Sequence, residues 1–285
     1  MLDKSLGASS NAALQQAKRL FCAAKAGHGG TLDPLATGLL PVLFGEATKF
    51  SSDLLEAGKS YLAELRLGVS TATADAEGTV LETRAIASSR EQIAAALEAF
   101  RGDIVQTPPL YSALKHQGKP LYAYARAGID IERKPRPVTI HALDLVGFTG
   151  GQLTLSVSCS KGTYIRTLAH DLGESLGCGA HLSALRRTRV GRFGLDTAHT
   201  LASLEALSEA ERDRLLLPLD ALLQELPAVP LAATEALRFT RGQAVNWPGG
   251  LQGRLRVYGT DGRLLGVGER AIDGQLIPRR LLSQT

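Results

Sequence analysis

The segment over residues 27–38 constrains this chain more than any other, because it reads G-H-G-G-T-L-D-P-L-A-T-G. Its glycines permit positive φ angles and let another part of the backbone approach closely. Pro34 disfavours the helical conformation at the residue before it, which places Asp33 in extended backbone. The sequence therefore predicts a stiff loop that presents one carboxylate, with no obvious charge partner in the same segment.

Asp33 has two interpretations at this point. An Asp followed by Pro is a common helix start, in which the Asp side chain caps the helix and Pro fills the first helical position. A carboxylate in a glycine-rich loop without a charge partner is energetically costly, which favours a chemical role instead. The other motifs of the chain decide between these two interpretations.

Four further stretches carry distinctive motifs. They are D-K-S-L-G-A-S-S-N at 3–11, K-S-Y at 59–61, P-P-L-Y-S-A-L-K at 108–115 and S-K-G-T-Y-I-R-T-L at 160–168. Taken in order with residues 26–50, they closely resemble the tRNA pseudouridine synthases of the TruB family in bacteria. A weaker similarity continues to R-R-L-L at 279–282, so the resemblance covers nearly the whole chain. Each motif alone is weak evidence, but the ordered set is very specific.

The resemblance implies an enzyme that isomerises uridine to pseudouridine in the T-loop of tRNA, at uridine 55. It implies Asp33 as the nucleophile, Tyr61 as a residue that stacks on uracil and stands near the sugar, and Arg166 as a catalytic partner. It also implies that the substrate-binding residues are Lys4, His28, Tyr164 and Leu185. His28 would fill the space that the flipped base vacates. No metal ion and no organic cofactor is implied, and the partner is the T-arm stem-loop of tRNA.

The position of Arg166 bears on Asp33 independently. Helical spacing over residues 163–176 places Arg166 in a first turn, where a cation opposes the helix dipole. One interpretation is a surface arginine that pairs with Asp171 or Glu174. The other is an arginine directed at Asp33, whose charge would keep that carboxylate ionised. The resemblance favours the second.

The pattern of elements predicts an α+β fold. Residues 1–226 are expected to form a catalytic domain with a mixed, mainly antiparallel sheet and flanking helices. Pro227 and Pro230 mark a boundary, after which turn signals at 259–262 and 273–274 predict hairpins. Residues 227–285 are therefore expected to form a small β domain, similar in position to the PUA-like RNA-binding domain of bacterial TruB proteins.

Periodicity and capping residues predict individual elements within this scheme. The expected helices are 9–26, capped at Ser9, Ser10 or Asn11, then 89–100, opened by a Ser89–Gln92 capping box, and 163–176. Alternation predicts strands over 61–67 and 153–159. After Thr200 we expect two short helices, one opened by a capping box at Ser208–Glu211.

The net charge of +4 is modest and fits a protein with a local basic surface better than one that coats polyanions indiscriminately. Charge alone does not establish a nucleic-acid partner. Candidate phosphate contacts are Lys4, Lys115, Lys119, Arg126, Arg133, Lys134, Arg136, Arg186, Arg187, Arg189 and Arg192. Three tyrosines, at 111, 122 and 124, interleave with the middle group. They could stack on exposed bases or be buried in the core.

The three cysteines, Cys22, Cys159 and Cys178, are far apart and form no C-x-x-C pair, which favours a reducing compartment over a disulfide scaffold. Cys178 and His181 have metal-ligand spacing, but no second pair completes a site. No apolar run of about 18 residues is present. The sequence predicts a cytoplasmic monomer.

Three departures from the family pattern stand out. Ser5 takes the place of the usual Pro, and Gly29 takes the place of a Thr, which would loosen the backbone beside His28 and put base flipping in doubt. The chain also begins almost at its first motif, where relatives carry an apolar strand. Either Met1 is not the natural start or a core strand is missing, at a cost in apolar burial.

Two rival functions remain open from the residues. One is an RNA-binding or RNA-folding protein with incidental catalysis, against which the presence of Asp33, Tyr61 and Arg166 together argues. The other is a hydrolase with Asp33 as nucleophile, for which no positioned base or metal set is apparent. The substitution Asp33→Asn separates these from the isomerase.

Overall fold

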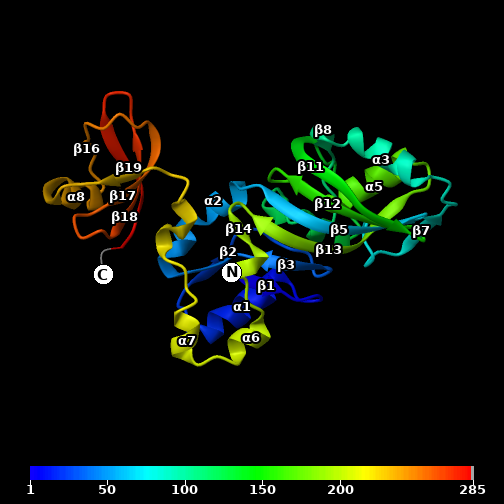
Figure 1. Cartoon of the computed structure of the whole chain (residues 1–285), viewed down its shortest axis with the longest axis horizontal. Helices are drawn as coiled ribbons and strands as arrows, with labels where there is room; N and C mark the ends of the chain where they lie inside the picture. The colour runs from blue at the N-terminus through cyan, green and yellow to red at the C-terminus, as the bar shows by residue number, and fades with distance from the viewer. Residues whose placement is uncertain (284–285) are drawn as a thin grey trace.

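The computed structural model describes residues 1–283 and contains one large mixed sheet (Figure 1). The strand order is β1-β3-β13-β5-β12-β11-β8, and β14 pairs with β13. Their bounds are β1 Leu2–Lys4, β3 Ala36–Leu40, β5 Lys59–Leu67, β8 Gly102–Gln106, β11 Arg136–Thr149, β12 Gln152–Cys159, β13 Ala180–Val190 and β14 Phe193–Gly194. Every pair is antiparallel except β3 with β13, so the α+β prediction with a mainly antiparallel sheet is confirmed.

The main core lies between this sheet and two helices, α3 (Arg90–Glu98) and α5 (Ile165–Ser175). Alternate residues of the strands point into it, among them Leu65 and Leu155, and Leu168 of α5 packs against them. Period-two alternation in the strands and 3.6-residue spacing in the helix thus bury one face of each element. This packing fixes α5, which carries Arg166, against the sheet.

A second group of elements lies beside β1 and β3 and contains the glycine-rich segment. The helices are α1 Ser10–Leu20, α2 Ser51–Glu56, α6 Leu201–Glu205 and α7 Glu209–Asp213, with 3₁₀ turns η1 Gly45–Phe50, η2 Leu195–Thr197 and η3 Leu219–Leu223. There are also two small antiparallel strand pairs. One joins β2 Ala26–His28 to β4 Val42–Phe44, with β3 between them in the chain, and the other is a hairpin of β6 Val69–Thr71 and β7 Val80–Thr83. The Asp33 loop connects β2 to β3.

The helix expected over residues 9–26 ends earlier than predicted. Its N-cap is Ser9, as one of the three candidates, but α1 stops at Leu20 and Ala26 already belongs to β2. Cys22 adopts a left-handed conformation with φ 46°, and the N–H groups of Cys22 and Ala23 bond the carbonyls of Arg19 and Lys18. This is a Schellman ending, for which glycine is the usual signal and cysteine gives none.

The other predicted elements are confirmed, with ends that differ by up to two residues. Both capping boxes form, at Ser89 with Gln92 and at Ser208 with Glu211. The strands expected over 61–67 and 153–159 are β5 and β12, and the turns at 259–262 and 273–274 join hairpin strands. Local signals of this kind depend on residues close in sequence, which is why they hold.

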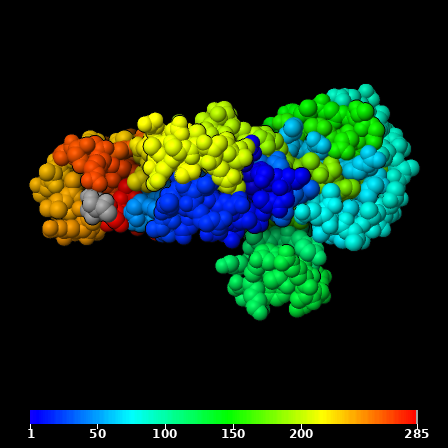
Figure 2. All heavy atoms as spheres, turned by 90° about the horizontal axis from the view of Figure 1, so that it is seen from below, coloured from blue at the N-terminus to red at the C-terminus, as the bar shows by residue number. Residues whose placement is uncertain are grey.

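Residues 107–135, which we call the projection, leave the body of the molecule as a separate lobe (Figure 2, green). The projection contains β9 Lys115–His116, β10 Lys119–Pro120 and α4 Leu121–Arg126. The side chains of Lys115, Lys119 and Arg126 are exposed on it. Its base follows β8 directly and reaches the first turn of α5, as described below.

The carboxyl-terminal residues form a five-stranded sheet with the order β15-β17-β18-β19-β16. The bounds are β15 Ala228–Pro230, α8 Ala233–Thr240, β16 Val245–Asn246, β17 Gly253–Tyr258, β18 Leu264–Arg270 and β19 Gln275–Leu281. The sheet has its own core around Phe239 and Leu255. It meets the rest of the chain through Phe50, Leu223 and Val267, and through an ion pair of 2.7 Å between Arg254 and Asp53.

No helix within residues 1–283 is long and apolar enough to cross a membrane.

Candidate active site

A cleft of about 170 Å³ opens beside the Asp33 loop. Five of the residues predicted for the site line it: Asp33, Tyr61, Tyr164, Arg166 and Leu185. They come from four separate parts of the sheet and its connections. The remaining lining residues are Thr31, Leu32, Ser112, Ala113, Thr163 and Ile165. Tertiary folding thus gathers motifs that lie more than a hundred residues apart in sequence.

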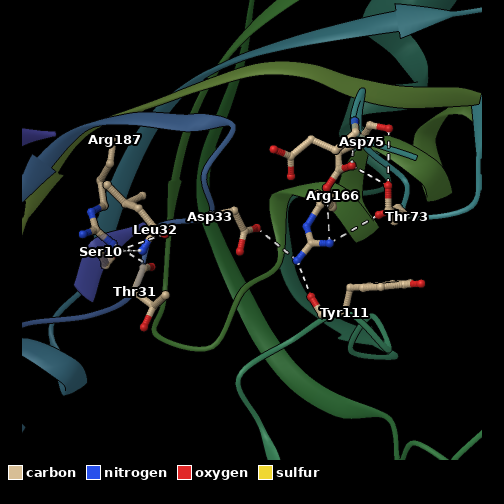
Figure 3. Close-up of polar contacts among 10 residues, drawn as sticks. Ser10, Thr31, Leu32, Asp33, Thr73, Asp75, Tyr111, Arg166 and Arg187 are labelled. Atoms are coloured by element: carbon tan, nitrogen blue, oxygen red, sulfur yellow. Dashed lines mark hydrogen bonds and ion pairs between the residues drawn. The ribbon is translucent and has the colours of Figure 1, made fainter. Parts of the chain in front are cut away.

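Asp33 projects from its loop toward the guanidinium group of Arg166 (Figure 3). Its Oδ2 lies 3.0 Å from Arg166 Nη2, and 43% of the Asp33 side chain is exposed. Burial raises the pKa of the Asp33 carboxyl, and the charge of Arg166 opposes that rise. A carboxylate that is accessible to a ligand and held beside a fixed cation is suited to nucleophilic attack.

The Arg166 guanidinium is buried, with 6% of its side chain exposed, and contacts three different segments. Besides Asp33, Nη2 donates to the carbonyl of Tyr111 at 2.7 Å. Nη1 lies 3.3 Å from Oδ2 of Asp75 and donates to the carbonyl of Thr73 at 3.4 Å. The predicted pairing with Asp33 is therefore observed, and the alternative pairing with Asp171 or Glu174 is not.

Asp75 was not predicted from the sequence. It lies in the turn between β6 and β7, its side chain is 4% exposed, and it accepts hydrogen bonds from the Thr73 hydroxyl and from the backbone N–H of Glu77. In sequence, T-A-T-A-D-A-E-G reads as an ordinary polar turn, and the folded structure alone brings it to Arg166. Arg166 is thus shared between one exposed and one buried carboxylate.

Replacing Asp75 with Asn is expected to lower the free energy of unfolding by about 3 kcal/mol, because a buried charge pair loses one partner. Urea unfolding followed by circular dichroism measures this. The matched control is Asp144→Asn, which breaks an exposed contact of 3.5 Å with Arg101 and is expected to cost under about 0.5 kcal/mol. If the two substitutions lowered the free energy of unfolding equally, the buried pair of Asp75 and Arg166 would not be important for stability.

Two side chains hold the Asp33 loop in place (Figure 3). The hydroxyl of Ser10 donates to the Leu32 carbonyl at 2.9 Å and accepts from the Leu32 N–H at 2.8 Å. Arg187, 1% exposed, donates to the carbonyls of Gly30, Thr31 and Leu39. The backbone before Asp33 is therefore anchored from two sides, as a preorganised nucleophile requires.

Arg187 corrects one sequence prediction. The sequence predicts a phosphate contact at Arg187, as at Arg186, Arg189 and Arg192, but the Arg187 guanidinium lies under the loop and is inaccessible to a phosphate. Successive residues of a strand point to opposite faces, so Arg187 turns inward on β13 where Arg186 turns outward and pairs with Asp3 at 2.6 Å. Burial lowers the pKa of Arg187, and contact with Tyr61 opposes that change.

Tyr61 and Tyr164 form aromatic walls of the cleft. Tyr61 also packs against the main core, and burial raises the pKa of its phenol, with the Arg187 charge acting the other way. Burial likewise raises the pKa of Tyr164, and the Ser112 hydroxyl opposes it. Both phenols are thus neutral at physiological pH, and their rings present apolar surface to a ligand.

Lys4 and His28 do not line the cleft. Lys4 is 1% exposed, and its Nζ donates to the carbonyls of Ser5 and Ala8 at 2.9 and 2.6 Å. Burial lowers the pKa of Lys4, and the charge of Asp33 opposes that change, which places the two within electrostatic reach. Burial, with the charge of Arg187, lowers the pKa of His28, and within residues 1–283 its buried Nδ1 has no hydrogen-bond partner.

The backbone at Gly29 is not loosened as the sequence suggested. Its N–H donates to the Pro41 carbonyl at 2.9 Å, and Leu54 of α2 packs against it so closely that an added Cβ would lie 2.6 Å from a Leu54 methyl group. The space that a side chain at Gly29 would occupy is therefore filled by Leu54 of α2.

Comparison with known families now places the chain. The model of the TruB family pseudouridylate synthase amino-terminal domain matches residues 18–165. The models of the tRNA pseudouridylate synthase B carboxyl-terminal domain and of the pseudouridine synthase II TruB carboxyl-terminal region match residues 166–224 and 227–282. The chain belongs to the TruB family of pseudouridylate synthases. It is an enzyme of the isomerase class.

Curated relatives of TruB type match over almost the full chain. A protein of Dechloromonas aromatica named tRNA pseudouridine synthase B is 58% identical over 282 residues, covering 99% of this chain and 94% of the relative. One of Aromatoleum aromaticum with the same name is 56% identical over 283 residues, with 99% and 92% covered. Among solved structures, a chain in the crystal structure of a Cbf5-Nop10-Gar1 complex has a TM-score of 0.74 and 28% identity, covering 99% of this chain and 83% of that one.

No cluster of three or more His, Cys, Asp or Glu residues within 1–283 is arranged to hold a metal ion. Cys178 is buried and unpaired, and His181 uses Nδ1 to bond the Val69 carbonyl at 2.8 Å. His181 therefore joins β13 to β6, whereas Cys178 packs in the main core.

Proposed function

We propose that this TruB-family enzyme converts uridine to pseudouridine in the T-loop of tRNA, at uridine 55, with Asp33 as the nucleophile. The observation that supports this best is the ion pair between an accessible Asp33 and a buried Arg166 in a cleft with aromatic walls. The curated relatives are named for activity on tRNA, and the family resemblance supports the T-loop as the target.

The reaction requires the target base to leave its stack, at a cost of a few kcal/mol. Tyr61, Tyr164 and Leu185 offer the base a pocket in which stacking recovers part of that cost. His28, whose half-buried imidazole has a lowered pKa, would occupy the space that the base vacates. Lys4, fixed near Asp33, would interact electrostatically with the substrate or with the nucleophile.

Asp33 would act as a carboxylate in one of three ways: by attack on ribose C1′, by attack on uracil C6, or by support of a glycal-like intermediate. In each case the bond from C1′ to N1 breaks and a bond from C1′ to C5 forms. C5 loses its proton and N1 gains a proton, so the product is an isomer of uridine. Tyr61 is the candidate proton acceptor near the sugar. Because burial raises the pKa of its phenol, which is neutral, it would accept that proton while passing its own to solvent. The reaction transfers no electrons and consumes no water, so these residues suffice without a cofactor.

The projection supports binding of the T-arm. Lys115, Lys119, Arg126 and Lys134 are exposed there, and Tyr122 is 41% exposed. Tyr124 is instead half-buried and donates its hydroxyl to the His116 carbonyl at 3.1 Å, so it holds the projection together. Exposed cations that neutralise phosphates would dock the stem-loop over the cleft.

Replacing both Lys115 and Lys119 with Ala is expected to weaken tRNA binding and to reduce the slope of log K against log salt by about 1 for each lysine that contacts a phosphate. The rate at saturating tRNA should stay unchanged. Fluorescence titrations at several salt concentrations measure the slope. Arg90→Ala on α3 is the control, and an equal loss of slope in that variant would count against a specific docking surface.

We further propose that the chain works as a cytoplasmic monomer in two parts, a catalytic domain over 1–226 and a PUA-like RNA-binding domain over 227–285. The separate core of the carboxyl-terminal sheet supports this division. Mapping of pseudouridine in tRNA by carbodiimide modification and primer extension tests the proposed target. A single stop at the T-loop uridine is expected, and stops elsewhere alone would refute it.

A further inference from the structure

Gln106 is buried beside the cleft but does not line it. It is the last residue of β8 and is 2% exposed. Its side-chain amide makes two bonds to the backbone of one residue, Tyr164: Nε2 donates to the Tyr164 carbonyl at 3.2 Å, and Oε1 accepts from the Tyr164 N–H at 3.0 Å. A glutamine side chain thus pairs with Tyr164 much as an adjacent strand would.

The bonds of Gln106 fix the point at which α5 begins. Tyr164 is the N-cap of α5, and its own side chain makes no capping bond. The first N–H groups of a helix need acceptors from outside the helix. Gln106 supplies an acceptor at this end from a different part of the chain. Tyr164 and Arg166, only two residues apart, both line the cleft and both depend on the placement of this first turn.

The chain that follows Gln106 continues along the same turn of α5. The Thr107 carbonyl accepts from the Thr167 hydroxyl at 3.4 Å, and the Tyr111 carbonyl accepts from Arg166 Nη2 at 2.7 Å. The same Nη2 contacts Asp33. A shift between residues 106–111 and α5 would therefore change the geometry of the Arg166–Asp33 pair.

We propose that Gln106 is a positioning residue for the isomerisation, which sets Tyr164 and Arg166 against Asp33; this rests on the proposed function. An amide can donate to a carbonyl and accept from an N–H at once, which a carboxylate or an alkyl group cannot. Asn is one methylene shorter than Gln and cannot keep both bonds from the same backbone position. Gln106 therefore combines the required chemistry with the required length.

Two variants test this role, Gln106→Leu and Gln106→Asn, in the full-length chain acting on an unmodified tRNA transcript. We expect kcat to fall about 10-fold, in keeping with the sensitivity of catalysis to small misplacements, while KM changes by less than about twofold. The acid limb of the pH–rate profile should move to higher pH, because Arg166 would support the Asp33 carboxylate less well. In an Arg166→Lys background, Gln106→Asn should move that limb no further.

The control is Gln152→Leu, which removes a side-chain amide that bonds Ser183 at 2.9 Å and Glu64 at 3.2 Å away from the cleft. It should lower the melting temperature without moving the acid limb. If folded Gln106→Leu or Gln106→Asn keeps the native kcat and acid limb, Gln106 only stabilises the fold and the inference is wrong. If the native chain itself forms no pseudouridine, the proposed function fails, and that outcome is distinct from activity that survives loss of Gln106.

Discussion

Replacing Asp33 with Asn is expected to abolish isomerisation and to leave tRNA binding within about twofold of the native affinity. An amide matches the carboxylate in size but is not a nucleophile, and loss of a nucleophile commonly costs at least roughly 10⁴-fold in rate. Asp33 is 43% exposed, so its contact with Arg166 contributes little to folding and the variant should remain folded. Single-turnover assays and binding titrations measure the two properties separately.

The control for this substitution is again Asp144→Asn, an exposed aspartate that pairs with Arg101 and does not line the cleft. It should leave both rate and affinity unchanged. Retention of isomerase activity in folded Asp33→Asn would exclude Asp33 as nucleophile. Loss of binding together with activity would instead assign Asp33 to substrate recognition.

Replacing Arg166 with Gln is expected to move the acid limb of the pH–rate profile to higher pH and to lower the plateau rate by about 10²-fold, the scale of a lost electrostatic contact in an active site. Activity requires ionised Asp33, so the rate rises as pH rises through the Asp33 pKa. Burial already raises that pKa and Arg166 opposes the rise, so removing the cation raises the pKa further. Measuring kcat/KM between pH 4 and pH 8 reports how far the acid limb moves. This interval begins near the ordinary pKa of a carboxyl group and extends to higher pH.

Arg166→Lys serves as the comparison because it keeps the charge but loses the forked geometry that joins Asp33 and Asp75. Its acid limb should lie between those of the native chain and Arg166→Gln. An acid limb at the same pH in all three proteins would show that the ionising group is not Asp33. Because Arg166→Gln also leaves Asp75 buried without its cation, the assays require a check of folding at each pH.

The parts of the fold that were predictable from sequence rest on local signals. Ser89 with Gln92 and Ser208 with Glu211 form their capping boxes because donor and acceptor lie three residues apart. The end of α1 was not predictable, because a Schellman turn at Cys22 carries no glycine to mark it. Side-chain capping between residues close in sequence thus makes the starts of helices predictable. A left-handed backbone conformation at a residue other than glycine is not predictable in this way.

The site was predictable where family motifs carried its residues and not where distant contacts define them. Asp33 and Arg166 were named from motifs, and their pairing is observed. Asp75 and Gln106 are not predictable from the sequence, because one lies in a polar turn and the other at a strand end, and both act through contacts with the start of α5. Gln106 lies 58 residues from its partner Tyr164.

Arg187 is a residue for which the sequence predicts a surface role that the structure does not bear out. An arginine in a basic cluster reads as a surface residue, and charged side chains are rarely buried unless they are paired. Arg187 is buried because three carbonyls accept from it, and they lie 148 to 157 residues away in sequence. The parallel pairing of β13 with β3 brings Arg187 close to this part of the chain.

The most direct test of the central claim is the release of tritium from uracil C5 in an unmodified, [5-³H]uridine-labelled tRNA transcript. The native chain should release one equivalent per tRNA, because the new bond from C1′ to C5 displaces the C5 hydrogen. A transcript in which cytidine replaces the T-loop uridine should release none. If no tritium is released from the first transcript, or if both transcripts release equal amounts, the chain is not an isomerase of the T-loop uridine.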